Sequence, residues 1–136
     1  MIRLVVRLAL VIFGVSMLAI SLTRLTDIPQ GDPMHGETLF DGASRPYLGC
    51  LQCHQNLNIA PRMVGLSKRI QQERLRRPEN TGETVAEYLA ESIIQPERYI
   101  VPGYLADLMP PTYSVGGSFG LSWRDLNDLV AYMMTL

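Results

Sequence analysis

The sequence predicts an all-α protein in which one N-terminal transmembrane helix precedes a small helical domain. Three observations predict this fold class. The first 26 residues are strongly apolar, with charges only near their two ends. Three later stretches each combine a helix-capping residue with apolar side chains or a proline at helical positions. No run alternates apolar and polar residues as a half-buried strand would.

The N-terminal segment, residues 1–26, is expected to be an uncleaved signal-anchor. Residues 8–22 carry no charge, and the apolar stretch extends over residues 4–25 if the flanking arginines reach the interfaces. About 20 apolar residues cross a bilayer, so this length suffices. A cleaved signal peptide is the alternative for the same pattern. Arg3 and Arg7 predict a cytoplasmic N-terminus, with the remaining chain on the outer face of the inner membrane.

Residues 27–31 are expected to be a short linker, and residues 32–136 to form one domain. Asp32 is suited to cap a helix that begins at Pro33. A second helix is predicted in "TVAEYLAESII" and a third in "SWRDLNDLVAYMMTL", because each begins with a capping box. The boxes and apolar stripes consist of Thr84, Glu87, Val85, Leu89 and Ile93, and of Ser122, Asp125, Leu126, Leu129, Val130 and Met133.

Composition excludes several classes of protein. The net charge is −1, which gives no overall basic character for binding nucleic acid. The chain has only 2 cysteines, too few for a disulfide framework or for the paired ligand clusters of a zinc finger. Long irregular stretches separate the last two predicted helices, and a small helical domain rarely carries such loops without a reason. We expect that they surround a large apolar cofactor.

The pentapeptide "CLQCH" places Cys50, Cys53 and His54 together. C-x-x-C-H is the attachment signature of c-type haem, in which the two thiols bind the haem vinyl groups and the histidine binds the iron. A thioredoxin-type redox pair or a zinc site is the alternative. The redox pair requires a βαβ context that the sequence does not predict. The motif therefore predicts one covalently attached haem c.

With this motif, residues 32–136 resemble a class I, monohaem cytochrome c. Gly36 and Phe40 are similar to the glycine and aromatic residue on the first helix of that family, and Tyr132 to the aromatic on the last helix. The resemblance implies that these two helices cross at close range, where only glycine allows the backbones to approach. It also implies that the carbonyl of Pro61 accepts a hydrogen bond from His54.

The resemblance implies that Met109, in "LMPPTY", is the second axial ligand of the iron, opposite His54. The chain has 7 methionines, but Met109 alone lies in a proline-stiffened loop at the expected place; a Met that only fills the core is the alternative. A bis-histidine site using His35 is less favoured than a histidine at the helix crossing. Four aromatic residues are candidates to line the pocket: Tyr99, Tyr104, Tyr113 and Trp123.

The function that the resemblance implies is one-electron transfer, not catalysis by this chain. We expect a subunit of a larger respiratory or photosynthetic membrane complex, such as alternative complex III, with its other subunits, redox proteins and membrane lipid as partners and no nucleic acid. The alternatives are a five-coordinate haem protein with a peroxidase or gas-sensing role, a free-standing membrane-tethered shuttle, or an assembly element. The basic residues between Lys68 and Arg77 form a solvated face, a docking surface or a contact with membrane phosphates.

Overall fold

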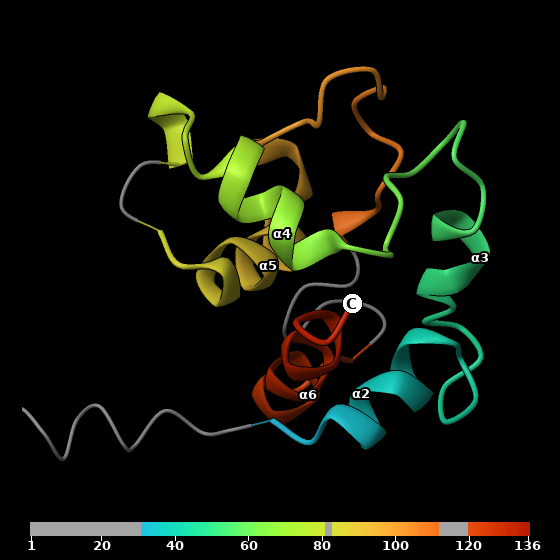
Figure 1. Ribbon diagram of the computed structural model, residues 1–136. Helices are drawn as coiled ribbons and strands as arrows, with labels where there is room; N and C mark the ends of the chain where they lie inside the picture. The colour runs from blue at the N-terminus through green and yellow to red at the C-terminus, as the bar shows by residue number, and fades with distance from the viewer. Residues whose placement is uncertain (1–30, 81–82, 112–119) are drawn as a thin grey trace, which may run out of the picture.

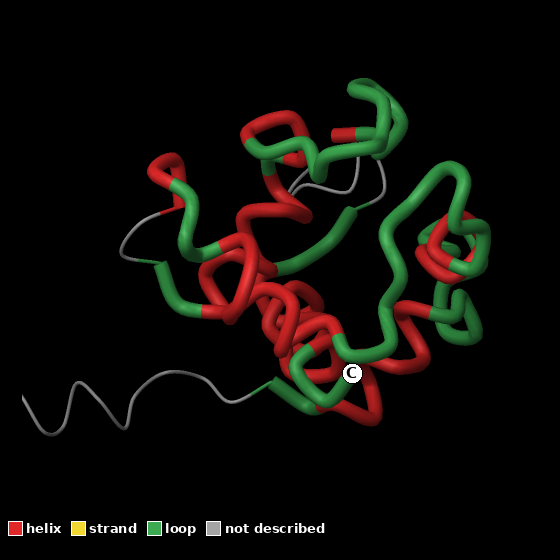
Figure 2. Tube along the Cα trace, turned by 45° about the horizontal axis from the view of Figure 1, so that its top comes forward, coloured by secondary structure: helices red, strands yellow, loops and turns green. Residues whose placement is uncertain are grey.

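The structure is a computed structural model that describes residues 31–80, 83–111 and 120–136. Its α-helices are α2 (Pro33–Phe40), α3 (Cys50–His54), α4 (Leu66–Arg69), α5 (Val85–Ile94) and α6 (Trp123–Met133). A π-helical turn η1 (Ile70–Arg74) continues α4, and two 3₁₀ turns are η2 (Pro78–Asn80) and η3 (Pro96–Arg98). Helices and long loops make up the described part of the chain, which contains no strand (Figures 1 and 2).

The predicted fold class is wrong in one respect. Within the described ranges, no helix is long and apolar enough to span a membrane. The segment for which we predicted a transmembrane helix, residues 1–26, lies outside the described residues, as does most of the linker at residues 27–31. The longest described helix, α6, has 11 residues, well short of the roughly 20 that a span requires.

The three predicted helices all begin where the sequence indicated. The side chain of Asp32 accepts hydrogen bonds from the backbone N–H groups of Met34 and His35, at 2.9 and 3.3 Å. Thr84 and Ser122 each form a complete capping box with the acidic residue three positions later. Each box satisfies two backbone N–H groups that the helix leaves unpaired, which fixes the first turn locally.

Helices α2 and α6 cross in close contact and bring the two ends of the domain together (Figure 1). A Cβ atom at Gly36 would lie 2.0 Å from the backbone oxygen of Asp128 and 2.8 Å from the Cβ of Tyr132. No side chain fits in that space, so the crossing depends on glycine. The rings of Phe40 and Tyr132 pack beside it, 5.6 Å apart between centroids.

A second set of hydrogen bonds ties the C-terminal residues to the start of α4. The backbone N–H groups of Gly65 and Leu66 donate to the carbonyl oxygen of Leu136, at 2.5 and 3.2 Å. The hydroxyl of Ser67 donates to the carbonyl oxygen of Met134 at 3.0 Å. Because α4 lacks a side-chain cap, these bonds satisfy N–H groups at its first turn.

The core lies among α2, α5, α6 and the inner face of α4 and η1. Its most deeply buried side chains come from all four segments and are Leu39, Ile70, Leu89, Leu126 and Leu129, together with Leu48. The predicted apolar stripe of α6 is buried along its whole length. These helices line one side of a cavity, and the loops at residues 59–66 and 99–110 line the other side.

Candidate functional site

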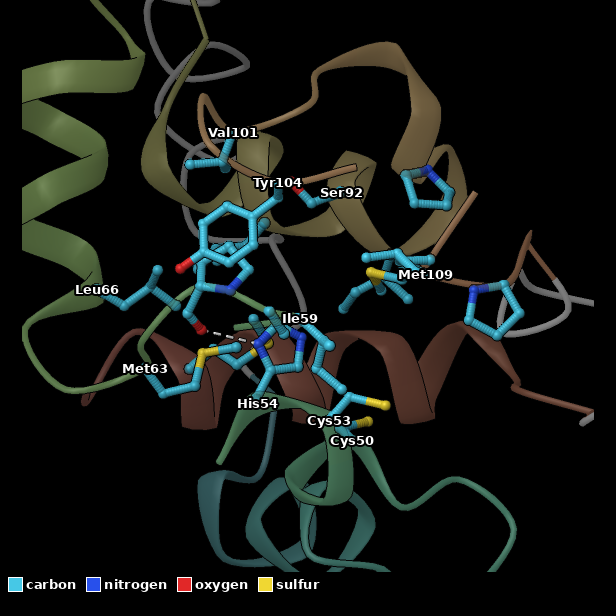
Figure 3. A pocket seen from close by; sticks show the side chains of 18 of the residues that line it. Cys50, Cys53, His54, Ile59, Met63, Leu66, Ser92, Val101, Tyr104 and Met109 are labelled. Carbon is cyan, nitrogen blue, oxygen red and sulfur yellow. Dashed lines mark hydrogen bonds between the residues drawn. The ribbon is translucent and has the colours of Figure 1, made fainter. Parts of the chain in front are cut away.

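The cavity is lined mainly by apolar side chains from α2, α3, α5 and α6 and from the loops at residues 59–66 and 99–110. Cys50, Cys53 and His54 lie at one side of it, on the single turn of α3 (Figure 3). Met109 lies across the cavity from α3 in the same view. The structure thus brings all five predicted site residues, including Pro61, to the lining of one cavity.

The two cysteines are free thiols in the structure. One turn of helix separates them, so both sulfur atoms lie on the same side of α3 (Figure 3). Burial raises the pKa of Cys50 to about 11, with a smaller contribution from the charge of Cys53 and an opposing one from a backbone hydrogen bond. Cys50 is therefore protonated at neutral pH. This is the opposite of the lowered pKa that activates a redox thiol.

The ring of His54 is held in one orientation. Its Nδ1 lies 3.0 Å from the carbonyl oxygen of Pro61, the contact that the resemblance implied. A carbonyl only accepts, so Nδ1 carries the proton and Nε2 presents a lone pair. Burial lowers the pKa of His54, the hydrogen bond to Pro61 opposes this, and the charge of Arg74 lowers it further. The ring of Phe40 packs 6.2 Å away, between centroids.

Met109 is half-buried and packs against the core from an irregular loop. Met63 also lines the cavity, but it belongs to the loop that follows Pro61 and therefore to the His54 side. Met133 lines the cavity as well, but from α6. Among the described methionines, Met109 alone reaches the cavity from the loop opposite His54, where two prolines follow it. A thioether at this position can bind a metal held on the other face by His54.

Of the remaining candidates from the sequence, two line the cavity and the others do not or lie outside the described residues. Tyr99 and Tyr104 line the cavity. Trp123 does not, and it is 65 % exposed at the start of α6. Tyr113 lies outside the described residues. His35 is also absent from the cavity lining; its Nδ1 lies 2.7 Å from a carboxylate oxygen of Asp128 at the crossing of α2 and α6.

Sequence reasoning missed Arg74, which lines the cavity and is only 7 % exposed. Its guanidinium lies over the ring of Tyr88, with the central carbon 5.6 Å from the centroid. The basic stretch between Lys68 and Arg77 is therefore not one uniform solvated face. The spacing of Leu66, Ile70 and Arg74, four residues apart each time, is the signal that could have placed Arg74 on the inner face.

The residues around the cavity fit a planar, largely apolar tetrapyrrole. Two thiols on one helical turn, an oriented imidazole and an opposing thioether are the donors that a c-type haem uses. Among the described residues, no three His, Cys, Asp or Glu side chains gather to hold a metal ion. A haem iron does not need such a cluster, because its porphyrin supplies four ligands and the protein one on each face.

Comparisons with known proteins returned no match: no family model, no curated protein and no solved structure is similar to this chain.

Proposed function

We propose that this protein carries one covalently attached haem c and transfers single electrons. The observation that carries the proposal is the convergence of Cys50, Cys53, His54 and Met109 on one apolar cavity. These four side chains come from a helical turn and from a loop more than fifty residues further along the chain. Core packing alone does not require two thiols, a histidine and a methionine to face the same space.

Each residue has a distinct part in this proposal. Cys50 and Cys53 would hold the group by thioether bonds formed when their S–H groups add to its two vinyl groups. Pro61 fixes the tautomer and ring orientation of His54, so that Nε2 binds the iron. Met109 would bind the iron from the side of the cavity opposite His54. The bound group supplies reversible Fe(III)/Fe(II) chemistry, and a thioether opposite an imidazole favours the reduced state.

If both His54 and Met109 bind the iron, it would have no open position for a substrate, and the bound group would transfer electrons without catalysis by this chain. A five-coordinate peroxidase or gas-sensing site is the second candidate, and it requires Met109 to stay unbound. The reduced protein with and without carbon monoxide distinguishes the two, since a spectral change on addition indicates an open site. A redox-active dithiol is disfavoured because burial raises the pKa of Cys50.

We further propose that the protein works within a respiratory or photosynthetic electron-transfer complex, such as alternative complex III, on the outer face of an energy-transducing membrane. Leu105 and Leu108 line the cavity and are 76 % and 44 % exposed. Such side chains at a cavity mouth suit contact with a redox partner. Copurification in mild detergent, with the partner subunits identified, tests this part.

Covalent attachment is tested by replacing the cysteines. The full chain is produced by a host that exports it and attaches c-type haem, and a denaturing gel is stained for haem. We expect the wild type to stain, C50A and C53A to stain weakly, and C50A/C53A not at all, because the chain has no other cysteine. Gln52→Ala is the matched control, since it changes the same turn and keeps both thiols. Full staining of the double variant contradicts the proposal.

A further inference from the structure

The loop that carries Met109 is tied to its neighbours by a single polar contact. The backbone N–H of Asp107 donates to a carboxylate oxygen of Glu97 at 2.9 Å. Among the described residues, no other hydrogen bond joins residues 105–110 to another part of the chain. Met109 also packs against the core through apolar contacts. The bond between Asp107 and Glu97 is therefore the one directional restraint on this part of the loop.

Asp107 has an unusual backbone conformation, two residues before Met109. Its φ is 61°, and it is the only described residue other than glycine with a positive φ. Aspartate enters the left-handed region more readily than most residues, but the conformation still costs free energy and persists only where neighbouring groups maintain it. A left-handed residue changes the direction of the chain. The N–H that Glu97 binds therefore belongs to the residue that directs the backbone toward Met109.

Glu97 lies on a turn that is itself held in place. It is the middle residue of η3, which directly follows α5. Pro96 begins this turn, is buried and lines the cavity, and its ring restricts the backbone there. Arg98 ends the turn and forms ion pairs with Glu91 on α5 and, at 3.1 Å, with Glu83 just before α5. A bond from Glu97 therefore fixes the loop relative to α5.

The carboxylate of Glu97 has no competing cation among the described residues. The ion pairs of this part of the chain join other carboxylates to His35, Arg45, Arg98 and Arg124. A bond from a backbone N–H to an ionised carboxylate is charge-assisted and stronger than one between neutral groups. Its strength is reduced here because both residues are exposed to water. We therefore expect an effect of one moderate hydrogen bond.

We propose that Glu97 positions Met109 on the iron by holding Asp107, and so determines how often the thioether is off the metal. The proposal rests on the proposed function, because it requires Met109 to bind a haem iron opposite His54. Glu97 is a positioning residue, since it acts through the backbone of Asp107. While the loop is held, a thioether that leaves the iron stays close and returns. Without this bond the thioether spends more time away from the metal.

The experiment measures the fraction of molecules in which Met109 is off the iron. Carbon monoxide binds the reduced holoprotein only in that state, so its apparent affinity is proportional to this fraction. Equilibrium titration compares wild type, E97A, E97Q and E79A, each as the full chain with its haem attached. Glu79 is the matched control, because it is exposed and is the middle residue of η2, another 3₁₀ turn that begins with proline.

We expect E97A to raise the apparent affinity for carbon monoxide about five- to tenfold, which corresponds to the loss of one hydrogen bond. E97Q keeps an acceptor oxygen and should raise it less than about threefold, and E79A less than about twofold. Amide hydrogen exchange at Asp107 should quicken in E97A by the same factor as the affinity. The midpoint of global unfolding in denaturant should stay unchanged, because the bond restrains one loop and not the core.

The outcomes separate this inference from the proposed function. A wild type without covalent haem contradicts the proposed function, and a wild type that binds carbon monoxide as tightly as M109A contradicts ligation by Met109. A wild type with haem attached and Met109 bound, beside an E97A variant with unchanged affinity, overturns only the role of Glu97. If E97A yields no holoprotein, Asp107→Pro replaces it, because proline removes the donor N–H. An unchanged affinity in that variant likewise overturns the inference.

Discussion

Replacing Gly36 with alanine should separate α2 from α6 and destabilise the domain. The added Cβ would lie 2.0 Å from the backbone oxygen of Asp128, whereas ordinary contacts begin near 3.4 Å. Backbone atoms on both sides of this contact belong to helices, so no side chain can rotate away. The helices must move apart by up to the difference, about 1.4 Å.

The cost follows from what that movement disrupts. A radial gap of about 1 Å forfeits up to roughly half of a dispersion contact. Leu39 and Phe40 each gain about 1.5–3 kcal/mol from burial, so their combined loss is about 1–3 kcal/mol. The hydrogen bonds of Asp128 with the Asp32 N–H, at 2.6 Å, and with His35, at 2.7 Å, lengthen as well. Weakening these two hydrogen bonds costs about a further 1–2 kcal/mol of stability. The higher helix propensity of alanine relative to glycine offsets about 1 kcal/mol of the total.

We therefore expect G36A to lower the free energy of unfolding by about 1–4 kcal/mol. Guanidinium titration of the purified protein, followed by circular dichroism, measures it. Met34→Ala is the matched control on α2, because Met34 is 78 % exposed and its loss should cost less than about 0.5 kcal/mol. A loss below about 1 kcal/mol in G36A would show that the crossing is looser than the structure describes.

Three further predictions concern the cavity and the core. Met109→His should abolish the weak long-wavelength absorption band that marks sulfur–iron ligation and should lower the reduction potential. Met63→Ala should keep that absorption band, and the reverse pattern would assign the ligand to Met63. Phe40→Ala should cost about 3–5 kcal/mol in a denaturant titration, because Phe40 is 4 % exposed; a cost under about 1 kcal/mol would contradict its packing role. Burial alone would raise the pKa of Asp125, but hydrogen bonds from Ser122 and the charge of Arg45 lower this pKa overall. The stability that ionised Asp125 contributes is therefore present above its ordinary pKa of 3.8 and is lost as the pH falls below that value. Asp125→Asn should flatten this acid limb in urea titrations at several pH values, and an unchanged limb would refute the assignment.

The helix starts could be predicted because they depend on neighbouring residues. Asp32, Thr84 and Ser122 each bond to N–H groups two or three positions away, so the pattern contains the whole interaction. The position of the thiol pair could be predicted for the same reason, since C-x-x-C occupies one helical turn. The contact between His54 and Pro61 followed from the resemblance and not from spacing.

The burial of Arg74 could not be predicted from charge, because runs of basic residues are usually solvated. The signal for its inward position is the four-residue spacing from Leu66 and Ile70, and the hydrogen bond from Asn80 to its backbone carbonyl oxygen has no such signal. The transmembrane helix was predicted from composition over residues 1–26, and the described residues contain no helix of that kind.

The crossing of α2 and α6 has a consequence for biosynthesis. Gly36 and Asp128 meet across almost the whole domain, and the first turn of α4 is bonded to Leu136. Neither interface can form until residues 128–136 have been synthesised, so the domain closes late, through contacts of long sequence separation that slow folding. Under the proposed function, we expect the haem to be attached before this closure, while the loops at residues 59–66 and 99–110 have not yet packed around the cavity.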